Sequence, residues 1–542
     1  MPGTHCLFAI NTNHSQPIPA SDNVPEIYLQ DESKTKGSAD RLFLPETEAQ
    51  LINILQASAD SGIPVTFSGA RTGITAGAVP SGGWVVGFEK MTGFTGMSFD
   101  ESKNTFRLKC KPGNSLNDIN AALVNPDSVC TDGWCDESIK ALEHFKTSKP
   151  QIFPPDPTER TASIGGMVAC NASGARTFFY GPTRNFITGL RIILAGGFLL
   201  ELKRGNYFAD EEGNFTLNIA GATIRQGKLP KYVMPKIKNT AGYFVKPGMD
   251  LIDLFIGAEG TLGAFSEIEI QLIPPPNEII SVIAFFPSEP DAFRFIHKSR
   301  EIERTNSLPK LLSLEYFDPN SLNLLREQKE LVGESSHIPE LSTESVAAVS
   351  IELASSEENM ENDAMELLEL LEECNSNPDK AWSAFDEQDL QHLKLFRHAL
   401  PESINQRIGE RATRHPGLTK LGTDIVVPDE CLIEMFSHYR NVLDNAGLEY
   451  VIFGHIGNNH AHVNILPNDL DEYRVGHNAY IELAEKAVAM GGSVAGEHGI
   501  GKLKTDMLLI MYKQQAIDEM RALKKVFDPD LVLNKGNIFD AT

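Results

Sequence analysis

The chain of 542 residues lacks the features that would indicate a nucleic-acid-binding, iron–sulfur or membrane protein. Its 48 Lys and Arg residues are outnumbered by 73 Asp and Glu residues, and the net charge of -25 repels phosphate backbones and anionic lipid headgroups. Its seven cysteines include no Cys-x-x-Cys pair, which disfavours an iron–sulfur cluster or a zinc ribbon. No window approaches the run of about 18 apolar residues that a membrane span needs.

The first residues, "MPGTHCLFAINTNHSQPIPASDN", also lack the basic region and long apolar stretch of a secretory signal. We therefore expect no transmembrane segment, no nucleic-acid partner and a reducing compartment such as the cytoplasm. A hydrophobic content of 41% and this length predict a globular protein of about two to four domains.

Two common nucleotide-binding motifs are missing as well. No G-x-G-x-x-G follows a strand-like segment, which argues against a Rossmann fingerprint. The stretch "GEHGIGKL" (496–503) has the G-x-x-x-x-G-K spacing of a P-loop, but Leu503 stands where the magnesium-binding Ser or Thr belongs. The sequence therefore argues against phosphate hydrolysis.

What the chain does have is three glycine-rich stretches. They are "SGARTGITAGAVP" (68–80), "PPDPTERTASIGGMVACNASGARTFFYG" (154–181) and "FIGAEGTLGAF" (255–265). Glycines let backbone N–H groups approach a ligand closely, and successive amides suit a pyrophosphate. Each stretch alone could be a turn, but the three together favour a dinucleotide held mostly by main chain.

Short strands and helices alternate along the chain. Residues 1–35 are polar and read as an extension, and 186–202 predicts a β-hairpin that turns at Gly196-Gly197. Three prolines at 274–276 predict a domain boundary, beyond which acidic helical stretches alternate with strands.

The segment "VIFGHIGNNHAHVNILP" (451–467) places three histidines in an otherwise strand-like run. A hairpin with Asn458-Asn459 as its two-residue turn would set His455 opposite His462, about 5 Å apart at Cβ, with Asn464 on the same face. A longer loop would also bring the two histidines together. We expect His460 at the exposed hairpin tip, with support of a metal ligand as the alternative.

A second polar cluster, "GEHGIG" (496–501), follows a probable helix and the Gly491-Gly492 pair. It carries Glu497 and His498. Two histidines and a carboxylate with an open position form a catalytic metal set, compatible with Zn²⁺ or Mn²⁺. A purely structural role for the histidine pair is the alternative.

Taken in this order, the three glycine loops, "GHIGNNHAHVNI" and "GGSVAGEHGIG" resemble FAD-linked D-2-hydroxy-acid dehydrogenases of the vanillyl-alcohol oxidase/PCMH flavoprotein superfamily. That branch includes D-lactate and D-2-hydroxyglutarate dehydrogenases and the flavin subunit of glycolate oxidase. The resemblance covers about residues 40–542. It implies an α+β fold, with a PCMH-type FAD-binding domain of two α+β subdomains and an α+β substrate (cap) domain with an antiparallel sheet.

The resemblance also implies a domain organisation. After the N-terminal extension (1–35), the FAD-binding domain would span 36–276 and the substrate domain 277–490. A C-terminal segment, 491–542, would return to the FAD-binding domain.

The resemblance implies FAD as the cofactor, bound without a covalent link because the first loop holds no histidine or cysteine. The residues expected to hold it are Ser68, Gly69, Ala70, Arg71, Thr72, Gly73, Pro155, Asp156, Ser163, Gly165, Gly166, Asn171, Ser173, Gly174, Glu259, Gly260 and Asn534. The first loop departs from the family's run of three glycines at Ala70 and Arg71, and Arg71 could add charge toward the pyrophosphate.

By the same resemblance the metal ligands would be His455, His462 and Glu497, with His498 as the catalytic base. The substrate carboxylate would pair with Arg397 and Lys420, and Asn464 would add a polar contact. Arg suits bidentate carboxylate binding, although either cation could instead lie at the surface.

The implied reaction is oxidation of a D-2-hydroxy acid, D-lactate first, with glycolate and D-2-hydroxyglutarate as alternatives. A non-catalytic electron-transfer subunit and an alkylglycerone-phosphate synthase-like transferase are further alternatives, but the transferases lack this metal set. Electrons would pass to a separate acceptor, such as a cytochrome, quinone, electron-transfer flavoprotein or iron–sulfur subunit. Through that acceptor a cytoplasmic protein could lie at a membrane, and a homodimer is compatible with the resemblance.

Overall fold

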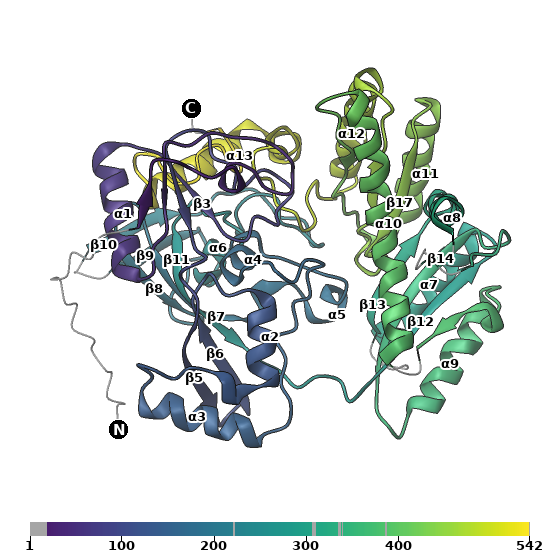
Figure 1. Cartoon of the computed structure of the whole chain (residues 1–542), viewed down its shortest axis with the longest axis horizontal. Helices are drawn as coiled ribbons and strands as arrows, with labels where there is room; N and C mark the ends of the chain where they lie inside the picture. The colour runs from purple at the N-terminus through teal and green to yellow at the C-terminus, as the bar shows by residue number, and fades with distance from the viewer. Residues whose placement is uncertain are drawn as a thin grey trace.

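The fold comes from a computed structural model, which describes residues 19–219, 223–305, 311–333, 338, 340–384 and 387–540. Figure 1 shows two lobes side by side, the first drawn in purple to teal and the second in green. The yellow C-terminal helix α13 (Thr505–Phe527) lies over the first lobe. Within the described residues, no helix is long and apolar enough to cross a membrane.

The first lobe contains two main sheets. The four-stranded sheet has the order β1-β2-β4-β3, with β2, β4 and β3 parallel. Its strands are β1 (Ala20–Ser21), β2 (Arg41–Phe43), β3 (Val65–Ser68) and β4 (Trp84–Gly87). The antiparallel five-stranded sheet, ordered β5-β6-β11-β7-β8, comprises β5 (Phe94–Asp100), β6 (Thr105–Cys110), β7 (Ile187–Ile193), β8 (Leu199–Lys203) and β11 (Ala264–Gln271). A separate pair is formed by β9 (Asn214–Ile219) and β10 (Thr223–Lys228).

Local sequence explains several of these elements. Helix α1 (Glu48–Ser61) begins where the Thr47 side chain accepts a hydrogen bond from the Gln50 backbone, and it ends at Gly62, whose φ is 64°. The predicted hairpin of β7 and β8 turns through Gly196 and Gly197, which have φ of 80° and 77°. The other helices of this lobe are α2 (Leu116–Val124), α3 (Asp136–Thr147), α4 (Ile164–Cys170), α5 (Thr177–Tyr180) and α6 (Ile252–Phe255), with 3₁₀ turns η1 (Glu26–Tyr28), η2 (Pro126–Ser128) and η3 (Thr183–Phe186).

The second lobe is built on a seven-stranded antiparallel sheet with the order β15-β12-β14-β13-β17-β18-β16. Its strands are β12 (Glu278–Phe286), β13 (Leu311–Phe317), β14 (Ala347–Ser355), β15 (Trp382–Ser383), β16 (Leu421–Gly422), β17 (Tyr450–Gly454) and β18 (His462–Ile465). The three prolines at 274–276 lie between β11 of the first lobe and β12 of the second. The prediction of an α+β fold with an antiparallel sheet in the substrate domain is therefore confirmed.

Helices cover both faces of this sheet. Successive side chains of β12 point to opposite faces, and apolar residues occupy both faces. Ile283 and Phe285 pack in one core with residues of α8 and α10, whereas Ala284 and Phe286 pack in another with residues of α7, α9 and α11. The helices of this lobe are α7 (Glu289–Thr305), α8 (Pro319–Val332), α9 (Met360–Glu373), α10 (Glu387–Arg414), α11 (Leu432–Asn445) and α12 (Leu470–Ala489), with 3₁₀ turns η5 (Pro378–Lys380), η6 (Asp429–Cys431) and η7 (Ile456–Asn458).

Both ends of the described chain contact the first lobe. Strand β1 pairs with β2, while residues 1–18 of the predicted extension lie outside the described residues. After α13, Leu533 bridges to Val65, the first residue of β3. Within α13, the buried Lys524 ammonium donates to the Thr261 and Leu533 carbonyls at 2.7 Å. These contacts join residues 524 and 533 to the first lobe.

The predicted two-residue turn of the histidine hairpin is wrong. The register pairs Phe453 with His462, and η7 with its αL end at Asn459 (φ 55°) fills the connection. His455 therefore lies in the loop and does not face His462 across the ladder. The longer loop still brings the two imidazole rings to 5.6 Å between centroids.

Candidate active site

The glycine loops of the first lobe surround a cavity of about 330 Å³. Most residues predicted to hold FAD line it: Gly69, Ala70, Arg71, Thr72, Gly73, Ser163, Gly165, Gly166, Ser173, Glu259, Gly260 and Asn534. The other predicted residues do not appear in this lining, namely Ser68, Pro155, Asp156, Asn171 and Gly174. Pro157, Thr158 and Glu159, which follow the predicted Pro155-Asp156 directly in the chain, line the cavity and were not predicted.

Close backbone approach explains why glycine is needed in these loops. A Cβ at Gly69 would lie 2.6 Å from the Ser163 hydroxyl, and one at Gly174 would lie 2.1 Å from the Asp156 carbonyl. Left-handed backbone at non-glycine residues also gathers here, at Arg71, Ala76, Glu259 and Asn534. A glycine cradle with exposed main chain fits a pyrophosphate-containing cofactor such as FAD.

Arg71 does not extend freely into the cavity. Its guanidinium donates to the Ser68 hydroxyl at 3.1 Å and the Gly69 carbonyl at 3.0 Å, and lies 4.7 Å from the centre of the Tyr28 ring. Its φ of 62° is the conformation that a glycine would adopt without cost. The Arg71 side chain therefore stabilises its own loop, and part of its hydrogen-bonding capacity is used by Ser68 and Gly69 of that loop.

Glu259 and Asn534 join the cavity to the C-terminal segment. The Glu259 carboxylate accepts hydrogen bonds from the backbone of Ile500 and Gly501, each at 2.7 Å, and burial raises its pKa to about 7. The Asn534 amide donates to the Glu259 carbonyl at 2.7 Å and accepts from the Phe67 backbone at 2.8 Å. These bonds hold the "GEHGIG" loop against the cavity.

Three predicted metal ligands converge at the edge of this cavity, which Glu497 and His498 also line. The Nε2 atoms of His455 and His462 each lie 3.3 Å from Oε1 of Glu497, and the three donors lie within 4.8 Å of one another. Two imidazoles and one carboxylate at this spacing fit a divalent ion such as Zn²⁺ or Mn²⁺.

The ionisation of these ligands follows from their neighbours. Burial alone would raise the pKa of Glu497, but Lys238, at 2.6 Å, and His455 hold it well below its ordinary value. Burial lowers the pKa of His455, yet Glu497 and Glu315 outweigh it and raise the pKa to about 9. Because a metal binds the neutral imidazole, binding would release this proton.

The predicted substrate-binding residues have different surroundings. Arg397, on α10, is ion-paired with Glu315, which also lies 2.9 Å from Nδ1 of His455. Against the cost of burial, Arg397 and His455 lower the pKa of Glu315 to about 2. Lys420 is half-buried just before β16 and has no ion pair or hydrogen bond within the described part of the chain, while burial lowers its pKa. Asn464 is buried on β18, in register with Gly422 of β16.

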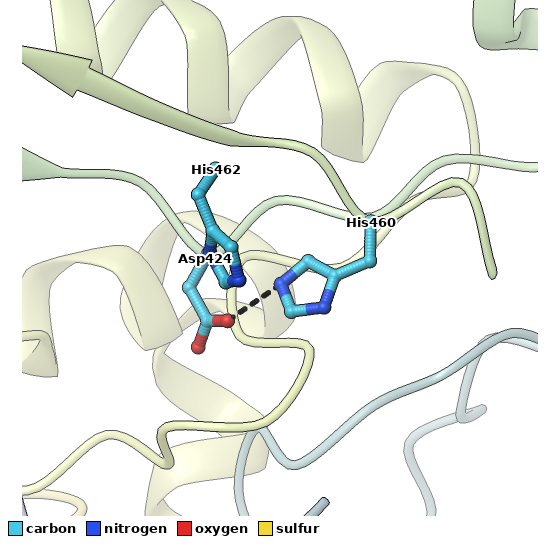
Figure 2. A group of neighbouring side chains, drawn as sticks. All are labelled: Asp424, His460 and His462. Atoms are coloured by element: carbon cyan, nitrogen blue, oxygen red, sulfur yellow. Dashed lines mark hydrogen bonds and ion pairs between the residues drawn. The ribbon is translucent and has the colours of Figure 1, made fainter. Parts of the chain in front are cut away.

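His460 is fully buried, so its predicted exposure at a hairpin tip is wrong. Figure 2 shows its ring directed at Asp424, with Nε2 at 2.8 Å from Oδ1, and His462 beside them. Asp424 also accepts from Lys504 at 3.1 Å and from the His498 backbone at 3.0 Å. These donors already occupy the Asp424 carboxylate, although Asp424, His460 and His462 also meet the spacing for a metal group. The other group of donors at this spacing is His455, His462 and Glu497.

The His498 ring lies near two carboxylates. Nδ1 of His498 lies 3.4 Å from Oδ1 of Asp424, while Nε2 lies 3.6 Å from Oε1 of Glu497. Burial lowers the pKa of His498 to about 4 against the opposing effect of Asp424, so its ring is neutral near pH 7.

Comparisons with known proteins agree with this architecture. A family model described as "FAD binding domain" matches residues 39–129 and 137–203. A second, "FAD linked oxidases, C-terminal domain", matches residues 275–538. The chain belongs to the FAD-linked oxidases and is an FAD-dependent oxidoreductase.

Several relatives are similar over nearly their whole length. A D-lactate dehydrogenase of Anaerostipes hadrus is 26% identical over 95% of this chain and 93% of its own. The glycolate oxidase subunit GlcD of Bacillus subtilis is 28% identical, over 92% and 89% respectively. A D-2-hydroxyglutarate dehydrogenase of Stutzerimonas stutzeri is 26% identical, over 92% and 91%.

Solved structures share the fold at lower identity. A 4-ethylphenol oxidase from Gulosibacter chungangensis has a TM-score of 0.61 and 15% identity, covering 95% of this chain and 91% of its own. An alkyldihydroxyacetonephosphate synthase has a TM-score of 0.57 and 14% identity, covering 92% and 76%. These two similarities establish the fold alone.

Proposed function

We propose that the protein oxidises a D-2-hydroxy acid, D-lactate first, to the 2-oxo acid in a reaction that depends on FAD and a divalent metal. The observation that carries this proposal is the convergence of His455, His462 and Glu497 beside the cavity for FAD. The names of the relatives, which act on D-lactate, glycolate or D-2-hydroxyglutarate, support the same class of substrate.

When bound, FAD would accept a hydride from C2 of the substrate, and the ion would supply Lewis acidity at its hydroxyl. His498 takes the hydroxyl proton at Nε2, because burial keeps the ring neutral and Asp424 lies at Nδ1. The loop that carries His498 is held in place by Glu259, which accepts from the backbone two and three residues further on.

Charge pairing around the site supports a substrate with one carboxylate. Lys238 is paired with Glu497, Lys504 with Asp424, and Arg397 with Glu315. Lys420 has no such partner in the described ranges, and we assign it to the substrate carboxylate. Arg397 would then act indirectly, by holding Glu315 against His455. One available cation favours D-lactate or glycolate over D-2-hydroxyglutarate, whose second carboxylate would need a further partner.

An electron-carrying subunit without its own substrate is the alternative from another class. The complete set of ligand and base residues argues against it, since such a subunit has no need of a metal site beside the flavin. In the reaction that we propose, the reduced flavin passes its electrons to a separate acceptor, a cytochrome, quinone, electron-transfer flavoprotein or iron–sulfur subunit.

Anaerobic bleaching of the flavin tests this proposal. D-lactate, L-lactate, glycolate and D-2-hydroxyglutarate are each added to the purified holoprotein, before and after treatment with a chelator. We expect rapid bleaching by D-lactate, its loss after chelation and its return with Zn²⁺ or Mn²⁺. A flavin that is indifferent to all four acids would contradict the proposal and favour the electron-carrying alternative.

A further inference from the structure

The two oxygens of the Glu497 carboxylate have opposite surroundings. Oε1 faces the Nε2 atoms of His455 and His462, both at 3.3 Å, on the side where the ligand donors converge. Oε2 faces the ammonium of Lys238 at 2.6 Å. One oxygen is therefore directed to the metal position and the other to a fixed positive charge.

The position of Lys238 is set by the structure around it. Its side chain is 6% exposed, and its ammonium also lies 3.2 Å from Nδ1 of His460. Two residues further on, the Thr240 backbone donates to the Ala495 carbonyl at 2.8 Å, and the Thr240 hydroxyl accepts from the Gly499 backbone at 3.2 Å. Ala495 and Gly499 lie on either side of Glu497 in the chain. The bonds of Thr240 therefore fix the backbone near Lys238 against the loop that carries Glu497, and they keep the ammonium close to Oε2.

We propose that Lys238 is a positioning residue that restricts Glu497 to one-oxygen coordination and thereby sets which divalent ion the site prefers. This inference rests on the metal site of the proposed function. Lys238 comes from the first lobe, whereas His455 and His462 come from the second, so the ammonium also ties the metal ligands to the lobe that carries the flavin cavity.

The chemical reason lies in ligand number and charge. Zn²⁺ is satisfied by four donors, and one-oxygen coordination leaves a position open for the substrate. Mn²⁺ accepts more oxygen ligands, and a carboxylate free to bind through both oxygens would favour it. A lysine that pairs with Oε2 also withdraws charge from the carboxylate, which leaves the bound ion more acidic toward a substrate hydroxyl.

A simpler role for Lys238 would be to neutralise a buried acid. That role predicts lower stability on its removal, with equal effects on every ion. The positioning role predicts a change in the ratio of affinities between two ions, which a general loss of stability does not produce.

The experiment measures Zn²⁺ and Mn²⁺ dissociation constants by competition with a chromophoric chelator, using flavin-loaded wild type, Lys238→Met and Lys238→Arg. Lys502→Met is the matched control, because Lys502 is another largely buried lysine that donates to a backbone carbonyl away from the metal ligands. We expect Lys238→Met to shift the Mn²⁺ to Zn²⁺ affinity ratio toward Mn²⁺ by about tenfold, the scale of effect of partners of metal ligands. Lys238→Arg and Lys502→Met should keep the wild-type ratio.

An unchanged ratio in Lys238→Met overturns the inference but leaves the metal site in place. A wild-type protein that binds neither ion overturns both the inference and the proposed metal dependence. If Lys238→Met does not retain flavin, Lys238→Leu replaces it, since this side chain also leaves Oε2 without a donor. A shift toward Mn²⁺ in that variant supports the inference, and no shift overturns it.

Discussion

The flavin cavity and the histidine cluster adjoin each other but are built in different ways. Glycines and left-handed backbone shape the cavity, and hydrogen bonds such as those of Glu259 and Asn534 secure its walls. The cluster consists of charged side chains that satisfy one another, with Lys238, Asp424 and Glu315 behind the ligands. The cavity should therefore be sensitive to added volume, and the cluster to lost charge or a lost donor.

Removal of a metal ligand should have the largest effect. In His462→Ala the site loses one of its two imidazoles, and the several kcal/mol that a Lewis acid supplies correspond to a loss of at least about 10³-fold in flavin reduction. Flavin content should not change, because the cavity lining does not include His462. Rapid-mixing absorbance measures the flavin content and the rate of flavin reduction, and metal analysis measures the bound ion. His438→Ala, which changes a histidine of α11 outside the cluster, is the control and should match wild type.

Removal of the base should come next. We expect His498→Asn to slow flavin reduction by about 10²- to 10⁴-fold, the usual contribution of general base catalysis. Metal and flavin content should both stay at the wild-type level, which separates this variant from the loss of a ligand. A variant that also loses its metal would show that His498 is part of the ligand set and would contradict its role as the base.

Added volume in the cavity wall should weaken flavin binding and leave the cluster intact. The Cβ of Gly69→Ala would lie 2.6 Å from the Ser163 hydroxyl, so either the loop shifts or the Ser163 side chain rotates and gives up its hydrogen bonds from the Ala70 and Gly166 backbone. Overpacking of about 1–3 kcal/mol predicts flavin binding weaker by about tenfold or more. The strength of flavin binding is measured by the fluorescence of released flavin. Gly409→Ala in α10, where a Cβ meets nothing within 4 Å, should retain the flavin fully.

Loss of Lys420, which has no ion pair among the residues that the structure describes, should have the smallest effect. Lys420→Met should raise KM for D-lactate by about tenfold, with a smaller change in kcat, since it removes one charge-assisted contact to the carboxylate. Steady-state kinetics with an artificial acceptor measure both constants. Lys140→Met, at an exposed lysine of α3, should change neither. An unchanged KM in Lys420→Met would remove the argument for a substrate with one carboxylate.

The sequence predicted those parts of the site that depend on local backbone chemistry or on two residue types close together. The glycine loops are recognisable because backbone approach demands glycine, and the histidines because imidazoles are rare in an apolar strand. Asp424 offered a weaker signal as an acid within the apolar run "TDIVVP" and was missed.

Lys238 gave no local signal, and Glu315 gave only the weak signal of an acid in the apolar run "LLSLEYF" (311–317). The partners of both residues come from distant parts of the chain. Lys238 pairs with Glu497, which lies 259 residues further along the chain. Glu315 of β13 pairs with His455, which follows β17, the strand that pairs with β13 in the same sheet. Only the folded chain brings these residues together. The hairpin register failed for a related reason. Asn458-Asn459 is compatible with a tight turn, but the 3₁₀ turn η7 and the buried ring of His460 determine the longer connection.

The return of the C-terminal segment bears on how the protein matures. Every strand of the three main sheets precedes Leu466, whereas Glu497, His498 and Asn534 follow it. During translation, the ribosome therefore delivers all strands of these sheets before the residues that complete the cavity and the ligand set. A nascent chain that reaches only Leu466 carries the strands of both lobes but lacks Glu497, His498 and Asn534, which line the cavity.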